Sequence, residues 1–191
     1  MKTGLFFGSF NPIHIGHLAI ANYMVEYTDL NQLWFIISPQ NPFKNKRSLL
    51  NDYDRFELVE KAIGDDPAFR VSNIEFRLPQ PSYTINTLTY LKERHPHDQF
   101  VLILGTDNLE TFHKWKNSEE ILKYHELYIY PRPGSDGGNL INHKKVRMVH
   151  APLIEISSEF IRNAIREDKN VRYFLPEKVY RYILEMHFYE K

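Results

Sequence analysis

Short apolar runs alternate with amphipathic stretches along the 191 residues of this chain. Six runs have the length and composition of buried strands: Leu5–Phe7, Gln32–Ser38, Ala68–Ser72, Phe100–Leu104, Leu127–Tyr130 and Lys145–Val149. Five further stretches have the features of helices: Ile15–Tyr27, Asp52–Ile63, Thr84–Glu93, Phe160–Arg166 and Pro176–His187. Short apolar strands that alternate with helices are typical of a parallel sheet covered on both faces. The pattern therefore predicts an α/β fold, with an open parallel sheet between two layers of helices.

Punctuating residues divide these elements from one another. Residues suited to cap or begin helices are Asn51 or Asp52, Ser157 or Ser158, and Pro176. A polar loop is predicted over Pro39–Ser48, and the Gly-, Pro- and Asn-rich stretch Pro131–Lys145 predicts a mobile loop. Because the chain has neither an internal repeat nor a linker-like segment, we expect a single domain over residues 1–191.

One run of ten residues carries most of the candidate chemistry, because it joins the first strand to the first helix. It reads GSFNPIHIGH, from Gly8 to His17. We expect Gly8 to permit an unusual turn and Pro12 to lie where the helix begins. A helix start presents free N–H groups and a partial positive charge to whatever lies above the sheet. The run therefore predicts a phosphate-binding corner.

Two histidines reinforce this interpretation. His14 and His17 are three residues apart, which puts both rings on roughly one face if the helix has begun, and Gly16 between them allows close approach. Two imidazoles beside free amides can stabilise charge that grows on a phosphoryl group. A zinc site and purely structural histidines are the alternatives. Zinc normally needs three or four ligands, and the chain has no cysteine to contribute one.

A second corner of the same kind is predicted near the end of the chain. Ser157 and Ser158 offer hydroxyls and amides at a helix start, and Arg162 lies one turn later, where its guanidinium can bind two phosphate oxygens. A plain helix cap with a surface arginine is the alternative. Taken together with the histidine motif, these residues favour a second anion site over a plain helix cap.

Composition narrows the class of protein. Lys plus Arg and Asp plus Glu number 24 each, so the formal net charge is zero, which argues against a general binder of nucleic acid or of an anionic membrane. The absence of cysteine excludes disulfides and thiolate catalysis and fits a reducing compartment. No leader-like segment and no stretch of about 20 apolar residues occurs, so we expect a soluble cytoplasmic protein. The sequence leaves a homo-oligomer open.

The spacing Gly-x-Phe-x-Pro-x-His-x-Gly-His resembles the nucleotide-binding motif of nucleotidyltransferases related to class I aminoacyl-tRNA synthetases. Three more stretches are similar, in order and spacing, to the bacterial nicotinate-nucleotide adenylyltransferases. They are Pro81–Thr84 with Thr87-Leu88, Gly105–Leu109 followed by Trp115, and Ile156–Arg162. The resemblance runs from Lys2 to about Tyr189, which is nearly the whole chain.

This resemblance implies a Rossmann-like fold and adenylyl transfer from ATP to nicotinate mononucleotide, a step of NAD biosynthesis. By it, the catalytic residues are His14, His17 and Arg162. The residues expected to bind ATP are Gly8, Ser9, Phe10, Gly16, Gly105, Asp107, Ile156, Ser157 and Ser158. Those expected to bind the acceptor nucleotide are Lys44, Tyr83, Thr84 and Trp115. Mg²⁺ is expected to bridge phosphate oxygens and keep its waters, since no carboxylate cage is evident.

Two positions depart from the family pattern: Asn11 stands where many members have Asp, and Phe43 where many have His. The first loses a charge near the phosphates and the second loses a phosphate contact. Adenylyltransferases for nicotinamide mononucleotide or phosphopantetheine, and a nucleotide-binding regulator without catalysis, remain as alternatives. An aminoacyl-tRNA synthetase is disfavoured because the chain is short, uncharged overall, and lacks the lysine-rich second motif.

Overall fold

Six strands form a parallel sheet in the computed structural model, which describes residues 1–39 and 49–190. The strands are β1 (Lys2–Gly8), β2 (Gln32–Ile37), β3 (Phe69–Ser72), β4 (Gln99–Gly105), β5 (Glu126–Tyr130) and β6 (Val146–Met148). Their order across the sheet is β3-β2-β1-β4-β5-β6, and every neighbouring pair is parallel. The predicted open parallel sheet is confirmed.

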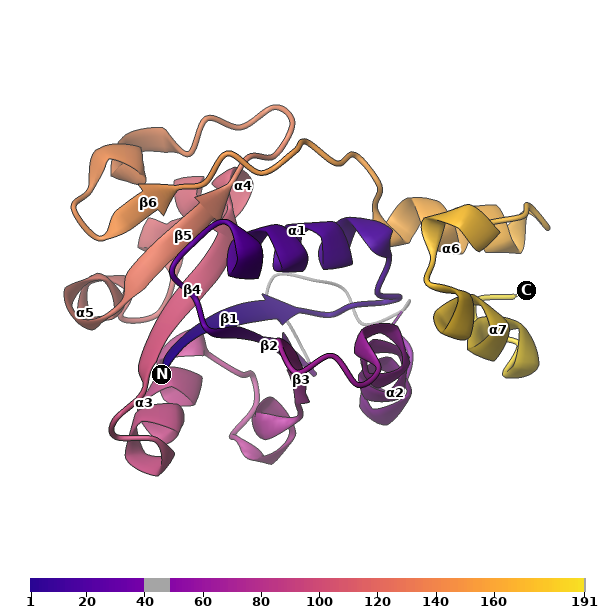
Figure 1. Ribbon diagram of the computed structural model, residues 1–191, viewed down its shortest axis with the longest axis horizontal. Coiled ribbons are helices and arrows are strands. Elements are labelled where there is room, and N and C mark those ends of the chain that lie inside the picture. The colour runs from indigo at the N-terminus through magenta and orange to yellow at the C-terminus, as the bar shows by residue number, and fades with distance from the viewer. Residues whose placement is uncertain (40–48, 191) are drawn as a thin grey trace.

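Helices cover both faces of this sheet (Figure 1). They are α1 (Ile15–Glu26), α2 (Asp52–Ile63), α3 (Thr84–Arg94), α4 (Thr106–Glu110), α5 (Ser118–Tyr124), α6 (Ser158–Arg166) and α7 (Glu177–Glu185). One apolar core joins the sheet to α1, α2, α6 and α7, and a second joins it to α3, α4 and α5. In the described part of the chain, no helix is both long and apolar enough to cross a membrane.

The alternation of side chains along β2 explains the two cores. Trp34 and Ile36 pack with the helices of one face, whereas Leu33, Phe35 and Ile37 pack with those of the other. All five side chains are at most 4% exposed. A strand buried on both faces reads as a continuous apolar run, which is why the sequence revealed it so clearly.

The strand order reverses between β1 and β4. From β1 the chain proceeds outward to β2 and β3, and it then returns to pair β4 with the other side of β1. In such sheets the loops at the carboxyl ends of the two central strands diverge and leave a crevice between them. Figure 1 shows α6 and α7 beyond the carboxyl end of β1, beside α2.

Several predicted boundaries need correction. Helices α4 and α5 were not predicted, because each is too short to show a helical period. The stretch predicted to be a mobile loop contains a 3-10 helix, Gly138–Asn142, that packs against α4, and its mobility stays a prediction. Pro176 is the cap of α7 and not part of its first turn, and that helix ends at Glu185. Other ends moved by one to three residues.

Candidate functional site

A large cavity, of about 1320 Å³, opens at the carboxyl ends of β1 and β4. All of the predicted site residues except Lys44 line it: Gly8, Ser9, Phe10, His14, Gly16, His17, Tyr83, Thr84, Gly105, Asp107, Trp115, Ile156, Ser157, Ser158 and Arg162. Lys44 and Phe43 lie outside the described residues. The structure thus brings together segments from both ends of the chain, while the role of each residue stays a prediction.

The turn after β1 is made differently from the prediction. Phe10, not Gly8, has the left-handed backbone, with φ 43°. Its ring is buried and lies against Gly8, where a Cβ atom would approach Phe10 Cζ to 2.7 Å. Gly8 is therefore needed to make room for an aromatic ring, and Phe10 belongs to the core while it also lines the cavity.

His14 caps helix α1, which begins at Ile15. Pro12 was expected to lie where this helix begins, but it lies three residues before the first helical residue. The backbone N–H of His14 donates to Nδ1 of His17 at 3.3 Å. Because Nδ1 accepts this hydrogen bond, a neutral His17 ring carries its proton on Nε2. The two rings stack with centroids 3.7 Å apart. Their shared face was predicted for a helix that has already begun at His14, whereas here His14 is the cap that precedes the helix.

The His14 side chain is almost completely buried, with 4% exposed. Burial, followed by the positive charge of Arg132, lowers the pKa of His14 to about 4. Its Nδ1 has no hydrogen-bond partner within the described residues. A buried polar atom without a partner is costly, so this geometry favours a ligand that supplies the missing contact.

The lowered pKa of His14 makes stability depend on pH. The unfolded chain binds this proton below about pH 6.5 and the folded protein only below about pH 4, so stability falls as the pH drops through that window. The shift corresponds to about 3 kcal/mol. We expect His14→Gln to reduce this acid-side loss, as measured by denaturant unfolding at pH 7, 5.5 and 4. Part of the acid-side loss should remain in the variant, because His125, whose pKa is also lowered, is present in both proteins. A pH dependence of stability equal to that of the wild type would contradict the burial argument.

Helix α6 brings the second predicted corner directly onto the first. Ser157 caps the helix, with its Oγ accepting the Phe160 N–H at 3.1 Å. Ser158 Oγ donates to the carbonyl of Pro12 at 2.8 Å, and Arg162 Nη1 donates to the carbonyl of Asn11 at 2.7 Å. The histidine loop and the amino end of α6 therefore share one wall of the cavity.

Arg162 resembles His14 in having an incomplete set of partners. Its Nε is buried and has no hydrogen-bond partner in the part of the chain that the structure describes. Burial is the main cause that lowers the pKa of Arg162, and a guanidinium nevertheless stays charged at neutral pH. A positive charge held in the cavity wall, with one N–H unsatisfied, is suited to bind an anion.

The end of β4 supplies Gly105, the helix α4 that follows supplies Asp107, and the segment after β5 supplies Arg132. Asp107 lies in the first turn of α4, is exposed, and approaches Arg132 Nε to 3.9 Å. The cap is Gly105, so the alternative role of Asp107 as a helix cap is not observed. Our sequence interpretation missed Arg132, which follows β5 directly and adds a second arginine to the cavity lining.

The far end of the cavity is aromatic. Tyr83 caps helix α3, Thr84 begins it, and Trp115 is half-buried with its ring 5.1 Å from that of Phe112. Lys116 Nζ, also missed by the sequence interpretation, lies 4.4 Å from the centre of the Tyr83 ring. A planar ligand and an anionic group would both find contacts here.

Glu75 is a buried acid at this end that the sequence interpretation did not single out. It is 2% exposed and accepts a hydrogen bond from Thr87 Oγ1 at 2.7 Å. Burial raises its pKa. The signal available was its position just before the Pro81–Thr84 stretch, which by itself does not distinguish a buried acid from a surface one.

The residues present do not form a protein cage for a metal. Within residues 1–39 and 49–190, no three His, Cys, Asp or Glu side chains are grouped so that they could hold an ion. The zinc alternative for His14 and His17 therefore has no third ligand among these residues. A divalent cation at this site would have to be held mainly by oxygens of a bound phosphate chain.

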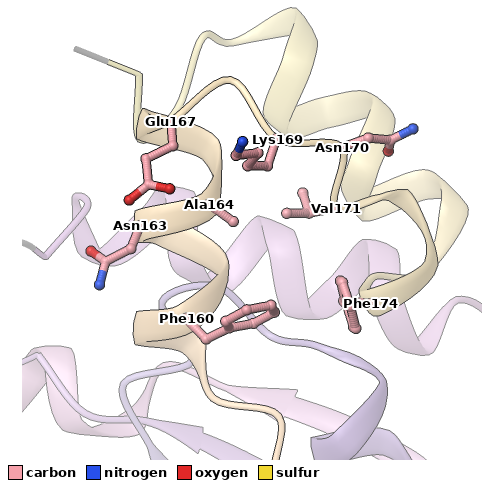
Figure 2. Close-up of a pocket in the computed structure, with 8 residues that line it drawn as sticks. All are labelled: Phe160, Asn163, Ala164, Glu167, Lys169, Asn170, Val171 and Phe174. Atoms are coloured by element: carbon pink, nitrogen blue, oxygen red, sulfur yellow. The ribbon is translucent and has the colours of Figure 1, made fainter.

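A smaller cavity, of about 260 Å³, lies between α6 and the segment that leads to α7 (Figure 2). Phe160 and Phe174 meet edge to face in its wall, at 5.2 Å between ring centroids. None of the predicted site residues lines it. The larger cavity is therefore the candidate site.

Comparison with known proteins places the chain in a family. The model of the family described as cytidylyltransferase-like matches residues 5–164. A protein of Cytophaga hutchinsonii named "probable nicotinate-nucleotide adenylyltransferase" is 54% identical over 99% of this chain and 98% of its own length. A protein of the same name from Flavobacterium psychrophilum is 52% identical over the full length of both.

A solved structure gives the same fold at low sequence identity. Nicotinic acid mononucleotide adenylyltransferase of Plasmodium falciparum, complexed with NaAD, has a TM-score of 0.82 at 18% identity, covering 98% of this chain and 97% of that one. The expected Rossmann-like fold is thereby confirmed. Because these two relatives share more than half of its residues over nearly its whole length, the chain belongs to the family of nicotinate-nucleotide adenylyltransferases.

Proposed function

We infer that this protein transfers the adenylyl group of ATP to nicotinate mononucleotide, producing nicotinate adenine dinucleotide and pyrophosphate in the biosynthesis of NAD. The observation that carries the inference is the pair of hydrogen bonds from Ser158 and Arg162 to the carbonyls of Pro12 and Asn11. They hold the loop that leads into α1 beside the start of α6, and two helix starts in one cavity wall support the binding of a chain of phosphates. The relatives that share this whole sequence carry the corresponding name.

The chemistry asks little of the protein beyond alignment and charge stabilisation. A phosphate oxygen of the acceptor attacks the α-phosphorus of ATP, and the bond to the oxygen that bridges α and β breaks, so that pyrophosphate leaves with the electron pair. Because the attacking phosphate is already an anion, no general base is required. We assign His14 and His17 to the α- and β-phosphates, and Arg162 with the Ser157–Ser158 cap to the leaving pyrophosphate.

The free protein holds His14 neutral, so it approaches ATP as a hydrogen-bonding group and not as a fixed cation. Negative charge beside the ring favours its protonated form, which would raise the pKa of His14 in the complex. Arg162 and Arg132 supply permanent positive charge beside His14 and His17, and Lys114 and Lys116 add charge elsewhere in the cavity lining. We assign stabilisation of the charge on the ATP phosphates to these two arginines together with the two imidazoles.

The aromatic end suits the acceptor. We assign the pyridine ring to Trp115 and its carboxylate to Thr84 and the backbone amides near Tyr83, where N–H donors satisfy an acid but leave the NH2 of an amide facing other donors. We assign Asp107 to a ribose hydroxyl and Lys44 to the acceptor phosphate. Mg²⁺ belongs to the substrate, entering with ATP on its phosphate oxygens. We further propose that the chain acts in the cytoplasm as one nucleotidyltransferase domain that binds neither nucleic acid nor membrane.

Pyrophosphate release from ATP tests this function, with nicotinate mononucleotide, nicotinamide mononucleotide or phosphopantetheine as the acceptor in parallel reactions. We expect the fastest turnover with nicotinate mononucleotide. Faster turnover with either other acceptor would overturn the substrate assignment and leave adenylyl transfer standing. Binding of ATP by calorimetry without pyrophosphate from any acceptor would instead identify a regulator.

A further inference from the structure

The segment after α7 reaches back to the histidine loop through Tyr189. This side chain is 9% exposed, and its hydroxyl donates to Oδ1 of Asn11 at 2.9 Å, in a hydrogen bond that is itself buried. The same oxygen accepts the backbone N–H of Leu50 at 3.2 Å. Asn11, one of the two positions that depart from the family pattern, thus links three segments that are distant in the sequence.

Asn11 is also the residue on which Arg162 is anchored. Arg162 Nη1 donates to the Asn11 carbonyl, and the His14 cap lies three residues further along the same loop. A displacement of Asn11 would therefore move a hydrogen-bond partner of Arg162 and the histidine corner together. Tyr189 binds the side-chain oxygen of Asn11, while Arg162 binds its backbone carbonyl.

A buried arginine fixes the other end of the loop. Arg55, 0% exposed, donates through Nη1 to the carbonyls of Ser9 at 2.7 Å and Ser38 at 3.0 Å. Arg55 therefore fixes the loop at Ser9. The part of the loop that begins at Asn11 is held by other hydrogen bonds, those made by Asn11 itself. The segment after α7 contributes to this part of the loop through the hydrogen bond from Tyr189 to Asn11.

The Tyr189 hydroxyl remains a donor under all ordinary conditions. Burial raises its pKa, and the positive charges of Arg162 and Arg55 only partly oppose this effect. A protonated phenol next to an amide oxygen has one role open to it, which is to donate the hydrogen bond that the structure contains.

We propose that Tyr189 is a positioning residue for adenylyl transfer, which acts through Asn11 to hold the histidine corner and Arg162 in the alignment that the transition state requires. The proposal rests on the proposed function, because it assigns the alignment to that reaction. Tyr189 itself touches no substrate in this account.

The test compares two variants that each lose one tyrosine hydroxyl. Tyr189→Phe removes the contact to Asn11, and Tyr182→Phe removes a hydrogen bond of 2.8 Å to Glu57, which lies outside the cavity lining. We expect Tyr189→Phe to lower kcat about tenfold, the effect of losing one buried hydrogen bond, with the KM for ATP changed less than about twofold because the ground-state phosphate contacts remain. Tyr182→Phe should leave both constants at the wild-type values.

A double variant tests whether the effect passes through Asn11. If it does, adding Tyr189→Phe to Asn11→Ala should cause no further loss of kcat, whereas independent effects would multiply. Melting temperatures of all variants separate this role from a general loss of stability. Equal kcat for Tyr189→Phe and the wild type, or multiplicative losses in the double variant, would overturn the proposal. Wild-type protein without pyrophosphate release would instead refute the proposed function.

Discussion

Replacing Arg162 by Ala is expected to lower kcat about a thousandfold, which is the order of effect seen when an arginine that stabilises transferring phosphates is lost. The residue combines a charge held in the cavity wall, an Nη1 fixed on the Asn11 carbonyl, and a buried Nε without a partner among the described residues. A bound anion would supply the hydrogen-bond acceptor that Nε lacks among these residues.

Lysine at the same position separates charge from geometry. We expect Arg162→Lys to retain the positive charge but lose the forked contact, leaving kcat about a hundredfold below the wild type. The control is Arg166→Ala, one turn later on α6, where the exposed side chain binds only Asn163 among the hydrogen bonds observed. Steady-state pyrophosphate release measures all three variants. Near-normal turnover in Arg162→Ala would remove this residue from the catalytic machinery.

Replacing His17 by Ala is expected to lower kcat about a hundredfold or more, by analogy with the loss of one donor that stabilises a developing oxyanion. Its Nδ1 accepts a hydrogen bond from the His14 backbone N–H, so in the neutral ring Nε2 carries the proton and would donate a hydrogen bond to a phosphate oxygen. The ring is also held edge-on against Phe10, at 5.1 Å between centroids. Such a fixed donor stabilises charge without first having to reorganise.

The matched control for His17 is His97→Ala, which removes an exposed imidazole outside the cavity. Its turnover should equal that of the wild type. Because His17 also packs in the wall of the core, melting temperatures are needed for both variants. Turnover within about twofold of wild type in His17→Ala, in a folded protein, would defeat its role in stabilising the transition state.

The parts of the site that are local in sequence could be predicted from it. The strand, turn and helix around His14 and His17 lie within a few residues of one another, so their spacing indicated a shared face if the helix had begun by His14. The helix begins at Ile15, and the two rings nevertheless stack. A cap at Ser157 or Ser158 was likewise predicted from their position before an amphipathic stretch, and the structure selects Ser157. Apolar runs located the strands because burial on both faces leaves an unmistakable pattern.

Contacts between distant segments could not be predicted in the same way. Asn11 and Tyr189 are 178 positions apart, and no local pattern connects them. Arg132 enters the site only because β5 pairs with β4, which brings the segment after β5 to the cavity. The unusual turn was expected at Gly8, whereas the left-handed backbone is at Phe10, because only the folded core shows where the aromatic ring must go.

The account depends on one arrangement, in which the imidazole corner and the α6 arginine bind the same polyphosphate. The most direct measurement is a crystal structure of the protein with a non-hydrolysable ATP analogue bound. We predict that the phosphates of a single analogue molecule contact the His17 ring and the Arg162 guanidinium together. A polyphosphate that lies against one of these groups and leaves the other without a phosphate contact would contradict it.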